Sequence, residues 1–133
     1  MSDDLRLIEK AKQVVKPRKL SSTADAGGVG AALLTDMGNI YTGVCINAAC
    51  SLGFCAEHTA IANMITQGES KIISIVAVDW DGSILPPCGR CREFIYQVNS
   101  FNINTRVILS ENSAKVLKDL LPMPWRVIVE PTI

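Results

Sequence analysis

Three cysteines, placed where two separate helices are predicted to begin, constrain the fold of this chain more than any other feature. Cys88 and Cys91 can supply two thiolate ligands from one helical turn. A third thiolate, from Cys55, can join them only if the fold brings the two helix N-termini together. The unpaired N–H groups of such N-termini favour ionised thiols. Taken alone, Cys88-x-x-Cys91 is also compatible with a structural zinc half-site or a redox pair.

Apolar periodicity alternates between helical and strand patterns along the chain. Helices are predicted over residues 5–15, 55–67, 89–98 and 113–121, and strands over residues 29–34, 40–46, 72–78, 106–109 and 126–129. Turns are predicted at residues 36–39 and 81–82, where Asp and Gly occur together. This order indicates an α/β fold with helices on both faces of a mixed sheet. No repeat or linker divides the 133 residues, so we expect one domain spanning residues 1–133.

Charge and composition exclude several classes of partner. The 13 basic and 13 acidic residues balance, so the chain lacks the basic excess with which proteins bind nucleic-acid phosphates. The uncharged stretch 37–56 is interrupted by glycine and asparagine, which argues against a membrane-spanning helix. Residues 1–10 have no apolar run of signal length, and five cysteines without such a signal indicate a reducing compartment. We therefore expect a cytoplasmic protein that binds neither nucleic acid nor membrane.

Glu57 follows Cys55 by two residues and therefore lies within one helical turn of it. Three protein ligands leave zinc one open position, as catalytic zinc sites require. Zinc lowers the pKa of a water bound at such a position to about 7. Glu57 can reach this water without being a ligand, which suits it to general acid–base catalysis. The combination of Cys55-x-Glu57 with Pro87-Cys88-x-x-Cys91 therefore favours a catalytic zinc site over a structural one.

These motifs resemble those of the zinc nucleobase deaminases. Segments 29–33, 55–61, 87–92 and 120–122 are similar, in order and approximate spacing, to the small all-cysteine cytidine deaminases, a family that includes blasticidin-S deaminase. The resemblance implies a three-layer α/β/α fold with a mixed five-stranded sheet. It implies one Zn²⁺ per subunit on Cys55, Cys88 and Cys91, with Glu57 as the proton shuttle. It also implies a cytidine-like aminopyrimidine nucleoside as substrate in pyrimidine salvage, and a homotetramer, with a homodimer as the alternative.

The expected substrate pocket departs from the family pattern. Gly27 replaces an aromatic residue that is usual in the nucleoside enzymes, and Cys45 and Asn47 replace the usual ribose anchors. A hydroxyl that faces an unpaired site loses about 1–3 kcal/mol, which favours a blasticidin-S deaminase-like or other modified-cytosine activity as the alternative. Trp125 stands where the family often places an aromatic that reaches a neighbouring subunit's site. The candidate substrate-contacting residues are Cys45, Asn47, Ala56, Pro87 and Trp125.

His58 and Arg92 are predicted to lie beside the metal ligands. His58 occupies a position where the family commonly has an arginine that donates to the zinc thiolates, and an imidazole can also donate. Arg92 follows the second cysteine motif as the family's arginine does. A structural zinc module with His58 as fourth ligand is one competing hypothesis. A nucleic-acid-editing deaminase is another, and the 5% aromatic content argues against it. Cys45 and Cys50 are otherwise expected to be small buried hydrophobic residues.

Overall fold

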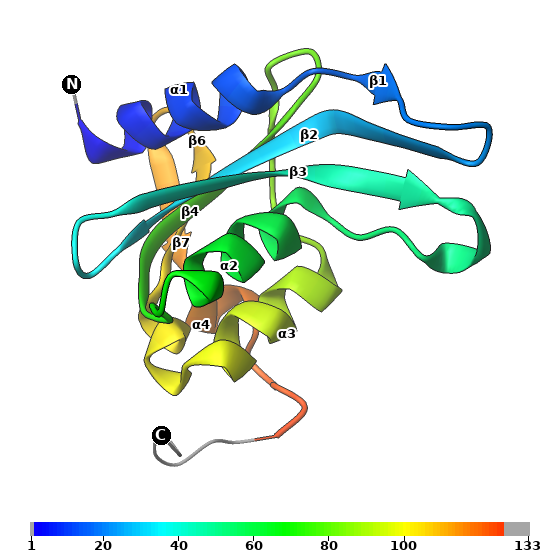
Figure 1. The fold of residues 1–133 in the computed structure, drawn as a ribbon. Helices are drawn as coiled ribbons and strands as arrows, with labels where there is room; N and C mark the ends of the chain where they lie inside the picture. Colours follow the sequence, from blue (N-terminus) through cyan, green and yellow to red (C-terminus); the bar gives the residue numbers. More distant parts are fainter. Residues whose placement is uncertain (1, 127–133) are drawn as a thin grey trace.

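A mixed sheet is the centre of the fold, and it contains seven strands within residues 2–126, which the computed structural model describes (Figure 1). The hydrogen-bonded path is β1-β2-β4-β6-β7, with β3 paired to β2 and β5 paired to β4. β4 and β6 are parallel, and the other pairs are antiparallel. The strands are β1 (Arg18–Lys19), β2 (Ala24–Thr35), β3 (Ile40–Ala48), β4 (Ile72–Asp79), β5 (Ile84–Leu85), β6 (Arg106–Ser110) and β7 (Ser113–Val116).

Helices cover both faces of this sheet, as Figure 1 shows: α1 lies on one face, and α2 and α3 lie on the other. The helices are α1 (Asp3–Val14), α2 (Ala56–Thr66), α3 (Gly89–Val98) and α4 (Leu117–Leu120), with 3₁₀ turns η1 (Ala49–Ser51) and η2 (Ser100–Asn104). Two buried clusters result: Leu7, Ile8 and Ala11 of α1 pack on one face, and Ala60, Ile61 and Met64 of α2 pack on the other. The predicted three-layer α/β/α fold is therefore confirmed. Four of the five expected strands are present as β2, β3, β4 and β6. The sheet also contains β1, β5 and β7, which the sequence did not predict as strands.

Local sequence signals account for the first helix. The Ser2 hydroxyl accepts a hydrogen bond from the N–H of Leu5 at 3.2 Å and so caps the helix. Asp3 and Asp4 occupy the first turn, where negative charge is favoured by the helix dipole. The helix ends at Val14, three residues before Pro17, close to where the Lys16-Pro17 pair predicts its end. The predicted helix over residues 5–15 is thus confirmed.

Glycine in β3 lets helix α2 approach the sheet closely. A Cβ atom at Gly43 would lie 2.4 Å from the backbone N of Ala60 and 2.6 Å from Cβ of Thr59. The Thr59 hydroxyl also donates to the carbonyl of Val44 at 2.8 Å, which ties the helix to the same strand. Because Cys55 is the N-cap residue of α2, the contact between Gly43 and α2 helps to set the position of this cysteine.

One predicted segment differs from the structure, and another lies mostly outside the described residues. The helix predicted over residues 113–121 is wrong in its first half, because Ser113–Val116 forms strand β7 against β6, with Val107 opposite Lys115. This pairing satisfies backbone groups that a lone short helix would leave to solvent, and only Leu117–Leu120 is helical. The predicted strand over residues 126–129 lies, apart from Arg126, outside the described residues. Among residues 2–126, none of the helices has the length and apolar character needed to cross a membrane.

Candidate metal centre and active site

The N-terminus of α2, which carries the first cysteine of the site, is held against strand β3. The chain leaves β3 through the turn η1 and returns at Phe54, which exchanges two backbone hydrogen bonds with Ile46 at 2.9 and 3.0 Å. Cys55 follows at once as the N-cap residue of α2, in extended backbone conformation. Glu57 then falls in the first turn of that helix. The short bridge between Ile46 and Phe54 therefore fixes the first cysteine and the glutamate together.

The second helix start presents the other two cysteines. Cys88 is the N-cap residue of α3, and Cys91 lies in the first turn with its side chain fully buried. The side chain of Arg92 donates from Nε to the carbonyl of Pro87 at 2.9 Å and from Nη1 to the carbonyl of Leu120 at 3.2 Å. Arg92 thus joins the residue before Cys88 to the end of α4. Arg92 lies next to Cys91 in the sequence, and its side chain binds backbone carbonyls on either side of the metal-ligand segment.

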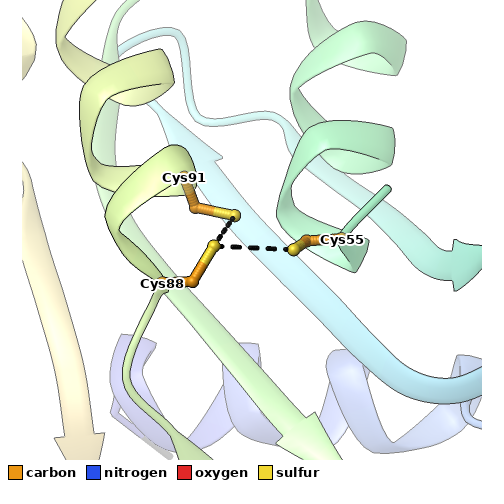
Figure 2. Close-up of side chains that lie close together, drawn as sticks. All are labelled: Cys55, Cys88 and Cys91. Atoms are coloured by element: carbon orange, nitrogen blue, oxygen red, sulfur yellow. Dashed lines mark hydrogen bonds between the residues drawn. The ribbon is translucent and has the colours of Figure 1, made fainter. Parts of the chain in front are cut away.

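The three sulfur atoms lie together, as Figure 2 shows. Sγ of Cys88 is 3.6 Å from Sγ of Cys55 and 3.4 Å from Sγ of Cys91, and all three lie within 4.8 Å of one another. Tetrahedral zinc–sulfur bonds of about 2.3 Å would place sulfur ligands about 3.8 Å apart. The separations and the soft donor set therefore fit zinc. In the described part of the chain, the cluster has these three members.

The environment makes the three thiols unequal. Burial raises the pKa of Cys55. Burial also acts to raise the pKa of Cys88, but hydrogen bonds from the backbone N–H of Cys91 and from neighbouring thiols bring that pKa below its usual value. Burial, followed by the nearby Glu57, raises the pKa of Cys91 far above its usual value. Cys88 is therefore the thiol that ionises most readily, and metal binding displaces the proton of each thiol that is still protonated.

Glu57 is a buried acid beside this cluster. Only 5% of the residue is exposed. Burial raises the pKa of its carboxyl, and hydrogen bonds to its own backbone N–H and to Cys91 offset part of that rise. A raised pKa makes a carboxylate a stronger base, which helps it to accept a proton from water. This is the property that a general acid–base catalyst needs.

A cavity of about 660 Å³ opens onto these groups. Its wall includes Cys55, Glu57 and Cys88. Of the predicted substrate-contacting residues, Cys45, Asn47 and Ala56 also line it. Pro87 and Trp125 do not line this cavity, although Pro87 is buried next to Cys88. The structure therefore brings two of the three predicted metal ligands, the glutamate and three pocket candidates to one cavity.

The family can be assigned from this geometry together with one comparison. Residues 1–108 match the model of the cytidine and deoxycytidylate deaminase zinc-binding region. The chain belongs to this family. The matched residues include all three cysteines and Glu57, so zinc is the metal that this cluster is positioned to bind.

Individual relatives of the deaminase domain agree with that assignment. A probable cytidine deaminase of Dictyostelium discoideum is 39% identical over 77 residues, which cover 56% of this chain and 52% of that protein. The chain thus spans about half the length of the first curated relatives it matches. A blasticidin-S deaminase of Bacillus cereus is 30% identical over 92% of this chain and 91% of that protein. The crystal structure of cytidine deaminase from Mycobacterium tuberculosis superposes with a TM-score of 0.79 at 28% identity, covering 96% of this chain and all of that one.

Two pocket positions of this deaminase domain are already engaged within the fold. The register between β2 and β3 shifts between Ala26 and Gly30, which leaves the N–H of Val29 outside the regular ladder. The Cys45 sulfur accepts that N–H at 3.3 Å. The Asn47 side chain donates from Nδ2 to Oδ1 of Asp25 at 2.8 Å. Both side chains thus stabilise the contact between β2 and β3.

Trp125 lies away from the cavity of its own chain. Its side chain is 75% exposed, and its backbone N–H donates to a carboxylate oxygen of Glu93 on α3. A contact with the site of a neighbouring subunit stays a prediction. Cys50 is also exposed, so the expectation that it is buried is wrong. The reason is that it lies in the loop after β3, in the left-handed conformation at φ 60°, outside the sheet.

The cavity also has walls that the sequence did not indicate. Gly28, Ser51 and Asp79 line it, and so does Arg90. Asp79 ends the buried strand β4, and a polar residue at the end of such a strand is a signal that sequence reading could have used. Ser51 carries no comparable signal. Its backbone adopts a positive φ of 56°, which is uncommon outside glycine.

Proposed function

We propose that the protein is a zinc-dependent hydrolase that replaces the exocyclic amine of a cytidine-like aminopyrimidine nucleoside with a carbonyl. One water is consumed and one ammonia is released for each amine converted. The observation that carries this proposal is a cluster of three thiols, two of which line one cavity together with the buried residue Glu57. The family assignment supports the same reaction class.

We assign the metal ligands to Cys55, Cys88 and Cys91, and the proton shuttle to Glu57. Zinc, when bound, supplies Lewis-acid activation of water near neutral pH. The Glu57 carboxylate takes a proton from the attacking water and gives it to the ring nitrogen beside the amine-bearing carbon. Glu57 then takes the remaining proton from the hydroxyl group added to that carbon and gives it to the amine. The C–N bond breaks, the amine leaves as ammonia and the hydroxyl oxygen becomes the carbonyl. Its burial, which raises the pKa of the carboxyl, favours both directions of transfer.

A structural zinc module has less support than this enzyme. A closed structural site needs four protein ligands, whereas the cluster within residues 2–126 has three members. The position left open by three ligands would be available for water. A nucleic-acid-editing deaminase is also disfavoured, because the balanced charge provides no basic excess for a phosphate backbone.

A blasticidin-S deaminase-like activity is the second candidate, and two observations favour it. The match to the Bacillus cereus enzyme extends over nearly the whole of both chains. In addition, Cys45 and Asn47 are occupied by contacts with β2, which weakens the case that they hold ribose hydroxyls. A modified cytosine that does not depend on these contacts would be the better substrate under this alternative.

We also propose that the subunits assemble, as a homotetramer or alternatively as a homodimer, in a cytoplasmic pyrimidine salvage enzyme. Large apolar side chains on the surface support self-association: Leu52 is 73% exposed, Trp80 70% and Trp125 75%. Light scattering on the purified protein would measure the assembly. A monomer at micromolar concentration would contradict it.

Ammonia release from cytidine, deoxycytidine, cytosine and blasticidin S tests the reaction and ranks its substrates. In the same assay, Glu57→Gln keeps the shape of the side chain but removes the proton shuttle. We expect kcat to fall about 10²–10⁴-fold while zinc content stays at one per chain. Glu69→Gln, the same substitution outside the cavity, is the matched control and should retain activity. Full activity of Glu57→Gln, or wild-type protein without zinc, would refute the proposal.

A further inference from the structure

His58 links the two helices that carry the metal ligands. It follows Glu57 on α2, and its ring reaches α3. Nδ1 of the ring lies 3.4 Å from Sγ of Cys91. One face of the ring stacks on Phe94, with centroids 4.4 Å apart and the planes inclined by 13°. One side chain thus touches a ligand sulfur and an aromatic ring on the same helix.

The contact with Cys91 has a defined polarity once the metal site is formed. A thiolate has no proton to give, so it can only accept a hydrogen bond from the imidazole. Nδ1 must therefore carry hydrogen when Cys91 is a ligand. Cys91 is fully buried, and its ionised sulfur gains little from water. A donor from the protein is then a direct way to stabilise its negative charge.

Phe94 determines where this donor lies. Cys91 and Phe94 are three residues apart on α3, so their side chains occupy the same side of the helix. Stacking on Phe94 fixes the plane of the imidazole ring. Within that plane, the orientation with Nδ1 toward the sulfur gains the hydrogen bond. Phe94 can therefore act on Cys91 through His58, because the stack and the N–H···S contact meet at one ring.

We propose that Phe94 and His58 form a positioning pair that holds an Nδ1–H group against the Cys91 sulfur and thereby strengthens retention of zinc. Neither residue needs to touch the substrate for this role. The inference concerns the same metal site as the proposed function and rests on zinc binding there. It does not depend on which amine is hydrolysed.

Zinc affinity of the full-length protein, measured by competition with a chromophoric chelator, tests the pair. His58→Leu removes the donor, whereas His58→Asn keeps an amide N–H close to the Nδ1 position. We expect His58→Leu to weaken zinc binding about 10–100-fold and His58→Asn to restore much of the loss. Phe94→Leu, which keeps an apolar side chain but loses the flat ring, should weaken binding about threefold to tenfold. Ile95→Val, a core substitution on the same helix, is the control for general loosening of α3.

A variant that carries both His58→Leu and Phe94→Leu shows whether the two residues act together or independently. If Phe94 acts through His58, then Phe94→Leu should change zinc affinity little in the His58→Leu background. Additive losses would overturn the pair, and wild-type zinc affinity in His58→Leu would overturn the role of His58. A second readout is the thiolate-to-metal charge-transfer band of the Co²⁺-substituted protein, which should shift in His58→Leu and return toward wild type in His58→Asn. Zinc-bound wild-type protein that is inactive on every aminopyrimidine would refute the proposed function. The zinc affinities of the variants would still show whether Phe94 and His58 act as a pair.

Discussion

The contact between Gly43 and helix α2 gives the sharpest test of how packing positions the active site. In Gly43→Ala, the added Cβ would lie 2.4 Å from the backbone N of Ala60. The helix and the strand must separate by about 1 Å before this contact reaches an ordinary 3.4 Å. The added Cβ is attached directly to the backbone of β3, and the N atom of Ala60 is part of the backbone of α2. No flexible side chain can therefore rotate away to relieve the contact. Helix α2, which carries Glu57, is expected to move.

The size of the effect follows from two opposed contributions. Overpacking of a well-packed interface costs about 1–3 kcal/mol. Alanine is otherwise favoured over glycine within a strand by about 0.5–1 kcal/mol. Taking the middle of each range, we expect the free energy of unfolding to fall by about 1 kcal/mol, and by at most about 2.5 kcal/mol. A displacement near 1 Å at a catalytic group lowers the rate about 10²-fold, so kcat/KM should fall further than the stability loss alone would suggest.

Urea unfolding and ammonia-release kinetics measure the two effects separately. Gly28→Ala serves as the stability control, because a Cβ at that position would meet nothing within 4 Å. Its urea midpoint should equal or exceed that of wild type. If Gly43→Ala unfolded at the wild-type urea concentration and kept its kcat/KM, the close approach of α2 to β3 would not be what holds Glu57 in place.

Three further perturbations test separate parts of the site. In Arg92→Lys, the single ammonium group cannot reach the carbonyls of both Pro87 and Leu120. We expect the free energy of unfolding, measured with urea, to fall by about 1.5–3 kcal/mol. An unchanged urea midpoint would contradict the bridging role of Arg92. Trp125→Ala should raise KM several-fold if this exposed ring completes a neighbour's pocket, and an unaltered KM would remove that idea. Removal of zinc by a chelator should abolish ammonia release, and added zinc should restore it. Activity that survives complete metal removal would exclude the proposed chemistry.

The sequence predicts the metal centre well because its determinants are local. A cysteine at an N-cap and a cysteine in the first turn have nearly fixed relations to their own helix, so the Cys88-x-x-Cys91 spacing implies two sulfurs on one side. Glu57 is likewise tied to Cys55 by a single turn of α2. What the sequence alone could not supply is the meeting of the two helix starts, for which a resemblance to known deaminases was needed.

Short elements that exist only through pairing with a neighbouring strand are predicted less well. Residues 113–116 have a composition compatible with a helix, yet β6 offers an open edge and converts them to strand β7. The strands β1 and β5 have two residues each, and so carry no periodic pattern of their own. They exist because β2 and β4 are already in place beside them. Tertiary context overrides local preference in each of these cases.

The wall of the cavity shows why pocket residues are harder to predict than metal ligands. Gly27 and Gly28 are adjacent and identical in sequence, but a Cβ on Gly27 would lie 2.0 Å from the carbonyl oxygen of Lys16, whereas Gly28 faces open space and lines the cavity. The irregular register of β2 against β3 between Ala26 and Gly30 separates their environments. A strand that slips by one residue exchanges its two faces, so a single irregularity decides which side chains a substrate meets. The set of residues that lines the cavity therefore depends on a feature of strand pairing, whereas the three cysteines are placed by helix starts that the motifs themselves specify.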